Sequence, residues 1–417
     1  MTPSPPSEVG SGRRVLRQYA SVTAGYAGSA VIRAVGLIVL ARLALPADFG
    51  LFSAVAGVIV IAQAALDLGL ARLILREHGG GEAARVVRSA LRLNIALSTV
   101  LGVVGLTGLA LVGTLVDGRI LFLLPLAVAA AAEKNADTSL SVAIAEGRGD
   151  VNTVNLIARR MLALSVFLCL ALTGLVEATL LAYACGEAVS ALFAAVLARR
   201  QIRGSVPDGP PLPYRRTARL GAPFWINSLA TQTRNLDVLL ITSIAGSTQG
   251  GFYASATRLT GPLQLLASSA ATVLLPVAAR SARRSRVFLA ALVVSGLMAL
   301  VYALLAALAP FFVPLLLGDA YVPAVPVIQI VLAGLPFACL SAVLASALQG
   351  WRRADVVATT AVLFTVVCLG GAIVGGVATG AAGAALGLAL AYLLQAGILT
   401  TVAAREARRS APTRGTE

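Results

Sequence analysis

Ten polar or charged side chains lie in the middle of long apolar runs, where each of them needs a structural or functional reason. A basic residue at the centre of a membrane costs ~2.5–3.5 kcal/mol on insertion scales. Arginine, lysine and amide groups suit an anionic, hydrogen-bonding substrate, whereas carboxylates suit coupling to Na⁺ or H⁺. The candidates for substrate binding are Arg33, Arg258, Arg234, Lys134, Gln264 and Asn227, and the candidates for ion coupling are Glu133, Asp137, Asp237 and Glu187.

Arg33 and Arg258 are the strongest ligand candidates, because neither has an acidic residue within four positions along the chain. Arginine makes bidentate contacts to phosphate oxygens, so two such residues lining one cavity could hold a pyrophosphate from opposite sides. The alternative is that each arginine pairs with an acid on a neighbouring helix, such as Asp67 or Glu187.

The remaining charges have partners at helical spacing. Arg234 and Asp237 are three positions apart, as are Lys134 and Asp137, so either pair could be a local ion pair. Glu133 and Asp137 are like charges four positions apart on one helix face. Two interpretations stay open for these acids: a proton or sodium relay, or a structural cluster neutralised by Lys134.

Composition gives the class of protein. The chain has 417 residues, of which 58% are hydrophobic and 12% charged, with a mean hydropathy of +0.88. Soluble domains carry about 25% charged residues, so we expect a polytopic membrane protein. The four cysteines lie in apolar runs and predict no disulfide framework, and the single histidine, His78, predicts no metal site.

Apolar runs of the length that spans a ~30 Å hydrocarbon layer predict an all-α protein with about twelve membrane spans. Residues 199–216 interrupt the pattern with four prolines, which exclude a continuous helix. We therefore expect two six-helix bundles joined by a linker. The predicted parts are an N-terminal tail (1–17), a first bundle (18–198), the linker (199–216), a second bundle (217–404) and a C-terminal tail (405–417). Within the bundles, the second span is expected at about 50–75, the fifth at about 151–176 and the seventh at about 220–245.

Basic residues divide unequally between the two sides that twelve spans create. We assign 27 to one side, three of them after the fourth span, and 2 to the other. By the positive-inside rule the basic side is cytoplasmic, so both termini and the linker are predicted in the cytoplasm. The net charge of +15 therefore reflects topology, and we expect no nucleic-acid partner.

A weak internal repeat relates the two halves. The segment AlaArgLeuAlaLeuProAlaAspPheGlyLeuPheSerAla (41–54) is similar to IleThrSerIleAlaGlySerThrGlnGlyGlyPheTyrAlaSerAla (241–256), about 200 residues further on. Six spans per half give both halves the same orientation. Repeats of this kind place substrate sites between the halves, near the bilayer midplane.

The start of the chain also resembles a known family. An arginine-bearing first span, then the segment 42–52, then AspLeuGlyLeu (67–70), is similar to the beginning of polysaccharide flippases. These belong to the superfamily that holds the lipid II flippases and the multidrug-and-toxin exporters. The resemblance implies two six-helix bundles around a cavity lined mainly by spans 1, 2, 4, 7, 8 and 10.

From these observations we expect a flippase, not an enzyme, in the cytoplasmic membrane. The resemblance implies that it moves polyprenyl-pyrophosphate-linked oligosaccharide to the outer leaflet by alternating access, for surface polysaccharide synthesis. The implied partners are the lipid-linked oligosaccharide, the bilayer, and a polysaccharide polymerase or glycosyltransferases. No cofactor is expected, and coupling to Na⁺ or H⁺ stays open. The alternatives are a cation-coupled multidrug exporter, against which Arg33 and Arg258 argue, and a non-transporting subunit of a glycan-synthesis complex.

Overall fold

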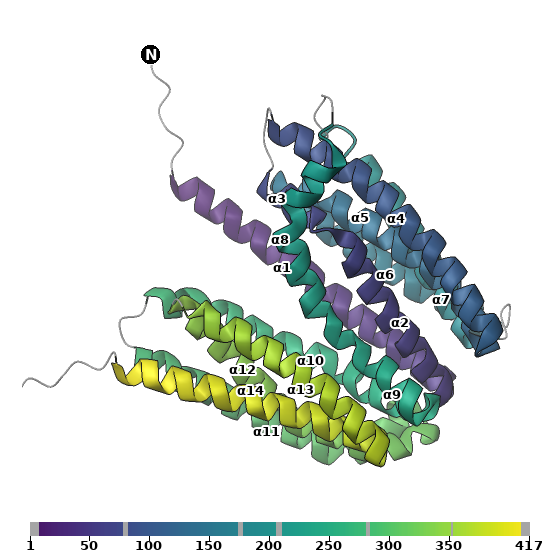
Figure 1. The fold of residues 1–417 in the computed structure, drawn as a ribbon, viewed down its shortest axis with the longest axis vertical. Helices are drawn as coiled ribbons and strands as arrows, with labels where there is room; N and C mark the ends of the chain where they lie inside the picture. The colour runs from purple at the N-terminus through teal and green to yellow at the C-terminus, as the bar shows by residue number, and fades with distance from the viewer. Residues whose placement is uncertain are drawn as a thin grey trace, which may run out of the picture. The chain divides into compact units, whose positions relative to one another are not determined.

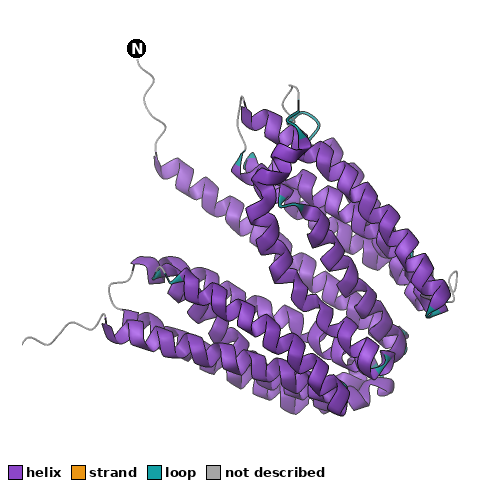
Figure 2. Cartoon of the chain, in the orientation of Figure 1, coloured by secondary structure: helices purple, strands orange, loops and turns teal. Residues whose placement is uncertain are grey.

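The computed structural model describes residues 8–77, 82–173, 178–205, 211–280, 284–351 and 353–409, and His78 lies outside them. These residues form α-helices joined by short turns (Figures 1 and 2). The helices are α1 (Glu8–Leu43), α2 (Pro46–Asp67), α3 (Leu70–Arg76), α4 (Glu82–Leu115), α5 (Pro125–Ala145), α6 (Gly149–Leu172), α7 (Thr179–Gln201), α8 (Tyr214–Gln232), α9 (Asp237–Ala245), α10 (Ser247–Arg280), α11 (Arg284–Leu317), α12 (Val325–Gly350), α13 (Ala354–Thr379) and α14 (Ala381–Arg409). Short 3₁₀ turns precede α5, α9 and α12: η1 (Gly118–Leu123), η2 (Thr233–Leu236) and η3 (Asp319–Ala324).

The predicted all-α polytopic fold class is confirmed. Each of the twelve expected spans corresponds to one helix or to two consecutive helices. Within the described residues, nine helical segments are long and apolar enough to cross a membrane. α5 is not one of them, because Glu133, Lys134 and Asp137 lie in its middle. Of the helices matched to the remaining expected spans, α8 and α10 are not among the nine found in the described residues either, so the chain is a multi-pass membrane protein with several polar helices among its spans.

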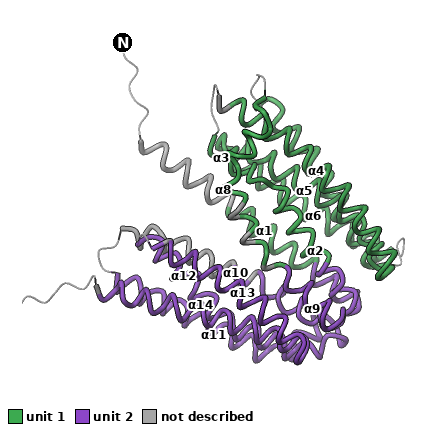
Figure 3. The backbone as a smooth tube through the Cα atoms, viewed as in Figure 1, with its two compact units in different colours: residues 1–36, 55–235 green, residues 37–54, 236–417 purple. Residues whose placement is uncertain are grey.

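Two compact units divide the chain (Figure 3). Unit 1 comprises residues 1–36 and 55–235, and unit 2 comprises residues 37–54 and 236–417. The end of α1 and the start of α2 therefore belong to unit 2, and α8 belongs to unit 1. The bundles predicted at 18–198 and 217–404 were defined by their membrane spans, whereas the two units are defined by contacts between residues. The division into these two bundles stays a prediction.

The core of unit 1 is built from α5 and α7. Alanines on one face of α5 (129, 132 and 136) pack on alanines of α7 (188, 191, 194, 195 and 198). α7 also packs closely on α6, where a Cβ added at Gly186 would lie 2.7 Å from the Ala163 carbonyl oxygen. Small residues let helix backbones approach each other within a membrane. This close approach fixes the relative positions of the charged side chains on these three helices.

The second expected span is broken at Leu68 and Gly69, whereas the sequence predicted one helix over about 50–75. Both residues are left-handed, with φ of 48° and 68°. A Cβ at Gly69 would lie 2.5 Å from the carbonyl oxygen of Gly221 on α8, so the backbones of the break and of α8 touch. Neighbouring helices make such a break tolerable within a membrane by satisfying the freed backbone groups.

The tryptophan of α8 provides that compensation. In an unbroken helix, residues 68 and 69 would donate to the carbonyls of Ala64 and Ala65. The Gly69 N–H donates instead to the Asp67 carboxylate (3.2 Å), and the Trp225 indole N–H donates to both carbonyls (3.1 and 2.9 Å). The seventh expected span is broken as well, by η2 between α8 and α9.

In unit 2, α12 packs on α10, α11 and α14, and α13 packs along α14. The α13–α14 contact depends on glycines, whose lack of a side chain allows close helix approach. A Cβ at Gly375 would lie 2.2 Å from the Gly383 carbonyl oxygen, and one at Gly371 would lie 2.8 Å from the Gly387 Cα. Gly376 faces open space, and Gly380 (φ 68°) ends α13.

This difference between neighbouring glycines gives a stability prediction. Gly375→Ala is expected to destabilise the protein by about 1–3 kcal/mol, because its Cβ meets backbone that must move. Gly376→Ala is expected to be neutral or slightly stabilising, since alanine is the better helix former. Thermal unfolding of the two purified variants in detergent measures the contrast. Equal melting temperatures would contradict the close contact between α13 and α14.

The starts of α2 and α10 contact each other reciprocally. A Cβ at Gly50 would lie 2.0 Å from the Ser247 carbonyl oxygen, and one at Gly251 would lie 1.8 Å from the Pro46 carbonyl oxygen. Gly50 and Gly251 are equivalent positions in the repeated segments, as are Pro46 and Ser247. Residues 37–54 thus belong to unit 2 because the first copy of the repeat packs on the second.

The loops assigned to one side of the membrane gather at one end of each unit. In unit 2, Arg284 and Arg353 both pair with Glu406 (2.7 Å each), which joins the starts of α11 and α13 to the end of α14. In unit 1, Arg148 donates to Ser205 (2.8 Å). These contacts agree with the predicted alternation of spans, and the assignment of this side to the cytoplasm stays a prediction.

The opposite side carries one local ion pair in unit 1. The Asp117 side chain caps η1 by accepting from the Arg119 N–H (3.0 Å), and it pairs with the Arg119 guanidinium (2.6 Å). Hydrogen bonding from Arg119 holds the pKa of the Asp117 carboxyl below its usual value.

Candidate functional site in unit 1

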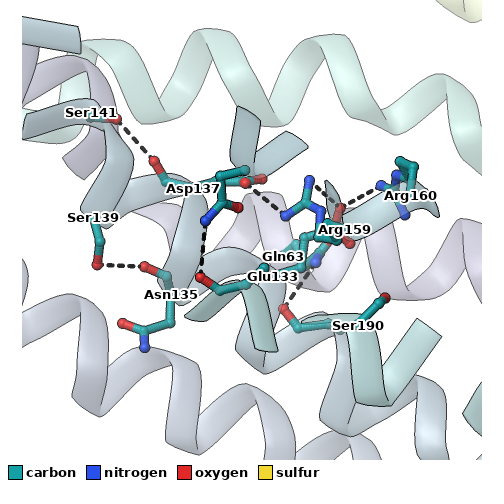
Figure 4. A network of polar contacts seen from close by, with 12 residues as sticks. Gln63, Glu133, Asn135, Asp137, Ser139, Ser141, Arg159, Arg160 and Ser190 are labelled. Carbon is teal, nitrogen blue, oxygen red and sulfur yellow. Dashed lines mark hydrogen bonds and ion pairs between the residues drawn. The ribbon is translucent and has the colours of Figure 1, made fainter. Parts of the chain in front are cut away.

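A cluster of five charged side chains lies among α5, α6 and α7, and Figure 4 labels four of them, Glu133, Asp137, Arg159 and Arg160. Glu133 and Asp137 occupy one face of α5, four positions apart, and Glu187 projects from α7. Arg159 and Arg160 are adjacent on α6, about 100° apart around its axis, so that they reach different partners. Because α7 packs on both α5 and α6, all three carboxylates come within reach of these two guanidinium groups.

Arg159 binds both acids of α5. Its Nη1 lies 2.9 Å from Asp137 Oδ1, and its Nη2 lies 3.1 Å from Glu133 Oε1. The side chain is only 3% exposed. A guanidinium buried to this degree is stable only when charged partners compensate for its lost hydration, which explains why two carboxylates converge on it.

Arg160 joins α5 to α7. Its Nη2 lies 2.7 Å from Glu133 Oε1, and its Nη1 lies 2.8 Å from Glu187 Oε2. The Tyr183 hydroxyl donates to the other oxygen of Glu187 (3.1 Å). One oxygen of Glu133 therefore accepts a hydrogen bond from Arg160 and forms an ion pair with Arg159, and removing either arginine leaves at least one acid with fewer partners.

Exposure distinguishes the three acids. The Asp137 side chain is 50% exposed, compared with 24% for Glu133 and 14% for Glu187. Asp137 is therefore the most exposed carboxylate of the cluster. The cluster holds three carboxylates and two guanidinium groups, so it carries one excess negative charge before Arg33 is considered.

Arg33 lies beside this cluster on the membrane-spanning part of α1. With Arg160, Tyr183 and Glu187 it lines a cavity of about 10 Å³, which is roughly the room that one water molecule needs. Its positive charge acts on both Glu133 and Tyr183. The Arg33 side chain is exposed, and within the described part of the chain no hydrogen bond or salt bridge joins it to the protein.

The structure corrects the predicted role of Lys134. Its ammonium group donates to Asn94 on α4 (2.6 Å), on a different side of α5 from the acids, whereas Asp137 pairs with Arg159. The local Lys134–Asp137 pair and the neutralisation of the cluster by Lys134 were therefore wrong. The reason is geometric, because the arginines of α6 reach the acidic face of α5 and the lysine does not.

The candidates in unit 2 form no cluster of this kind in the described residues. Asp237 accepts a hydrogen bond from the Tyr253 hydroxyl (3.1 Å) and another from the Val238 N–H (2.7 Å). Arg258 and Gln264 are half-buried on α10. Two further candidates, Arg234 and Asn227, belong to unit 1, and their side chains lie outside the described part of the structure, so the Arg234–Asp237 pairing stays a prediction.

Arg159 and Arg160 are the residues that the sequence analysis missed as site candidates. They were counted with the basic residues after the fourth span, although they lie inside α6, a candidate membrane span. The signal was present in the sequence, because Arg159 lies ten residues beyond Gly149, or about 15 Å along the helix axis. Two of the 27 basic residues assigned to the cytoplasmic side are thus membrane-embedded, and the asymmetry between the two sides remains large.

Charged side chains buried in membrane-spanning helices indicate a functional site in a membrane protein. Comparisons with known proteins identify the family to which the chain belongs. Residues 15–282 match the family described as "Polysaccharide biosynthesis protein", which is more than half of the chain. The chain therefore belongs to this family, as its resemblance to polysaccharide flippases predicted. Among curated protein sequences, none matches it.

Solved structures share the fold at low sequence identity. An inward-facing multidrug resistance transporter of the MATE family, in the MOP superfamily, has a TM-score of 0.72 at 15% identity, covering 93% of this chain and 96% of that one. The lipid II flippase MurJ in its inward closed conformation gives 0.73 at 11% identity, covering 91% and 87%. A MOP-superfamily transporter from Pyrococcus furiosus gives 0.63 at 15% identity, covering 96% of each chain. At these identities the likeness establishes the shared fold.

Proposed function

We propose that the protein transports a polyprenyl-pyrophosphate-linked oligosaccharide from the cytoplasmic to the outer leaflet, for surface polysaccharide biosynthesis. Membership in the polysaccharide biosynthesis family supports a cargo of this class. The fold shared with MOP-superfamily transporters and with the lipid II flippase MurJ supports movement of a lipid-linked substrate by alternating access.

The observation that carries the proposal is the state of Arg33. It is a guanidinium in a membrane-spanning helix, exposed, and without a hydrogen bond or salt bridge to the described residues. The excess negative charge of the neighbouring cluster compensates part of the cost of placing this charge in a membrane, but it gives the Arg33 N–H groups no hydrogen-bond acceptor among the described residues. A pyrophosphate offers oxygens that a guanidinium binds with two parallel hydrogen bonds. Arg258 of α10 is proposed as a second contact to the same group.

Depletion of the protein in its host tests the cargo. Loss of a flippase is expected to leave its lipid-linked intermediate in the cytoplasmic leaflet, where glycosyltransferases assemble it. Mass spectrometry of extracted lipids would then detect a polyprenyl-pyrophosphate oligosaccharide that increases several-fold. Accumulation of no lipid-linked glycan, together with increased sensitivity to cationic drugs, would favour the multidrug exporter.

Asp137 is proposed as the residue that couples transport to a proton or sodium gradient, since it is the most exposed acid of the cluster. Asp137→Asn is expected to abolish the dependence of transport on the gradient. It removes a titratable group and leaves Arg159 paired with Glu133. Transport by proteoliposomes with and without an imposed gradient measures the effect, with Asp150→Asn at the start of α6 as the matched control. Full gradient dependence in both Asp137→Asn and Glu133→Gln would make the cluster purely structural.

A further inference from the structure

A second polar site lies in unit 1 on another side of α5, in a groove formed by α4, α5 and α7. Its cavity has a volume of about 250 Å³, and α4 contributes Ile95 and Ser98, α5 Val128 and Asn135, and α7 Leu192 and Arg199. Pockets for drug-sized molecules are usually about 300–1,000 Å³. The groove therefore fits a narrow chain segment better than a bulky ligand.

The groove is polar at one end and apolar at the other. On α7, Leu192 and Arg199 are seven residues apart, which corresponds to about 10 Å along the helix axis. Arg199 lies near the end of α7 that adjoins the linker, the side predicted to be cytoplasmic, and Leu192 lies closer to the middle of the helix. A lipid in the cytoplasmic leaflet has the same polarity, with its charged headgroup near the surface and its acyl chain toward the centre.

The exposed rim of the groove is apolar. The side chains of Ile95, Leu192 and Val196 are 44%, 48% and 52% exposed. In a membrane-spanning unit, exposed apolar side chains of this size are solvated by lipid chains. The groove is therefore open to an acyl chain from the bilayer.

The Arg199 guanidinium has no acidic partner among the groove residues, and the group nearest to it is the neutral amide of Asn135. The Asn135 oxygen accepts from the Asn94 amide (3.2 Å) in one orientation. Turned around, the same oxygen accepts from Arg199 Nη2 (3.0 Å) and Nε (3.3 Å). In either orientation the partner that the groove offers Arg199 is at most a neutral amide, so its positive charge remains available to an anion.

A buried hydroxyl provides a second, independent sign of a ligand. Ser98 lines the groove and is only 5% exposed. Its Oγ has no hydrogen-bond partner within the described structure, although many serines and threonines in these helices bond to the carbonyl one turn back. A buried hydroxyl without a partner costs free energy, and an ester or phosphate oxygen of a lipid would satisfy it.

We infer that this groove binds an anionic glycerophospholipid, with the phosphate on Arg199 and one acyl chain along Val128 and Leu192. The bound lipid would occupy the annulus of unit 1, separate from the Glu133–Arg159–Arg160 cluster. The inference does not depend on the identity of the transported cargo.

Native mass spectrometry of the purified full chain, with phosphatidylglycerol or phosphatidylcholine added, tests the inference. The wild-type protein is expected to retain phosphatidylglycerol about ten-fold better than phosphatidylcholine, as one charge-assisted contact would provide. Arg199→Gln is expected to reduce retention of phosphatidylglycerol to the level of phosphatidylcholine. Arg200→Gln removes the same charge from the neighbouring position, which does not line the groove, and should leave retention unchanged.

A steric variant tests the acyl-chain part independently of charge. Val196→Trp fills the rim of the groove and is expected to reduce retention of both lipids. Val189→Trp, an exposed position two turns away on the same helix, serves as its control. Equal retention of the two lipids by the wild-type protein would overturn the inference, as would identical behaviour of Arg199→Gln and Arg200→Gln.

Discussion

Arg160→Leu is expected to destabilise the protein by about 3–5 kcal/mol, the usual effect of removing one partner from a buried ion pair. The substitution deprives Glu187 of its salt bridge and leaves it with the Tyr183 hydroxyl. Glu133 keeps only the 3.1 Å contact to Arg159. Carboxylates within membrane-spanning helices then carry charge without compensation, which lipid and low-dielectric surroundings penalise.

Arg148→Leu is the matched control for this prediction. Arg148 pairs with Glu146 at 2.6 Å, but the two side chains are 39% and 23% exposed. Exposed ion pairs contribute about 0–1 kcal/mol. Thermal unfolding in detergent should therefore show a large decrease in stability for Arg160→Leu and a small decrease for Arg148→Leu. Adding Glu187→Gln to Arg160→Leu should recover part of the loss, and equal unfolding of the two single variants would contradict a stabilising ion-pair cluster.

Arg33→Ala is expected to slow transport by roughly ten- to a hundred-fold, because a lost charged hydrogen bond costs ~1.5–3 kcal/mol. Protein stability should change little, since no described residue depends on Arg33 for a hydrogen bond or salt bridge. Arg33→Lys should retain intermediate activity, because lysine keeps the charge without the bidentate geometry. We expect the same order of activities for Arg258→Ala and Arg258→Lys.

Transport and protein abundance must be measured together for these variants. Arg119→Ala, at a loop arginine paired with Asp117, removes one positive charge away from the membrane-spanning segments and should flip substrate at the wild-type rate. An Arg33→Ala protein that is abundant, folded and fully active would exclude an anion contact at this position. Loss of protein rather than of activity would assign Arg33 to structural support of the cluster.

The fold was largely predictable because membrane helices follow from apolar length. The similarity between the two repeated segments was also recognisable in the sequence, and in the structure each segment contains a turn between helices, α1–α2 in the first and α9–α10 in the second. The break at Leu68 and Gly69 was not predictable, because its compensation comes from Trp225, more than 150 residues away. An isolated glycine in an apolar run does not by itself indicate where a helix breaks.

The site was predictable only in part. Glu133, Asp137 and Glu187 were identified from their position in apolar runs, and the structure brings them together. Their partners were misassigned because local spacing favoured Lys134, three residues from Asp137 on the same helix. Which acids meet Arg159 and Arg160 depends on the way α7 packs between α5 and α6, and that contact rests on alanine faces that carry no information about charge.

Flipping by the purified protein alone is the most direct test of the central claim. Proteoliposomes would contain a fluorescent polyprenyl-pyrophosphate oligosaccharide, and an impermeant reagent would report the fraction in the outer leaflet over time. We predict that the wild-type protein equilibrates the substrate between leaflets and that Arg33→Ala does so at least ten times more slowly. Vesicles containing well-folded wild-type protein that equilibrate no faster than protein-free vesicles, at any imposed gradient, would contradict the proposed flippase activity.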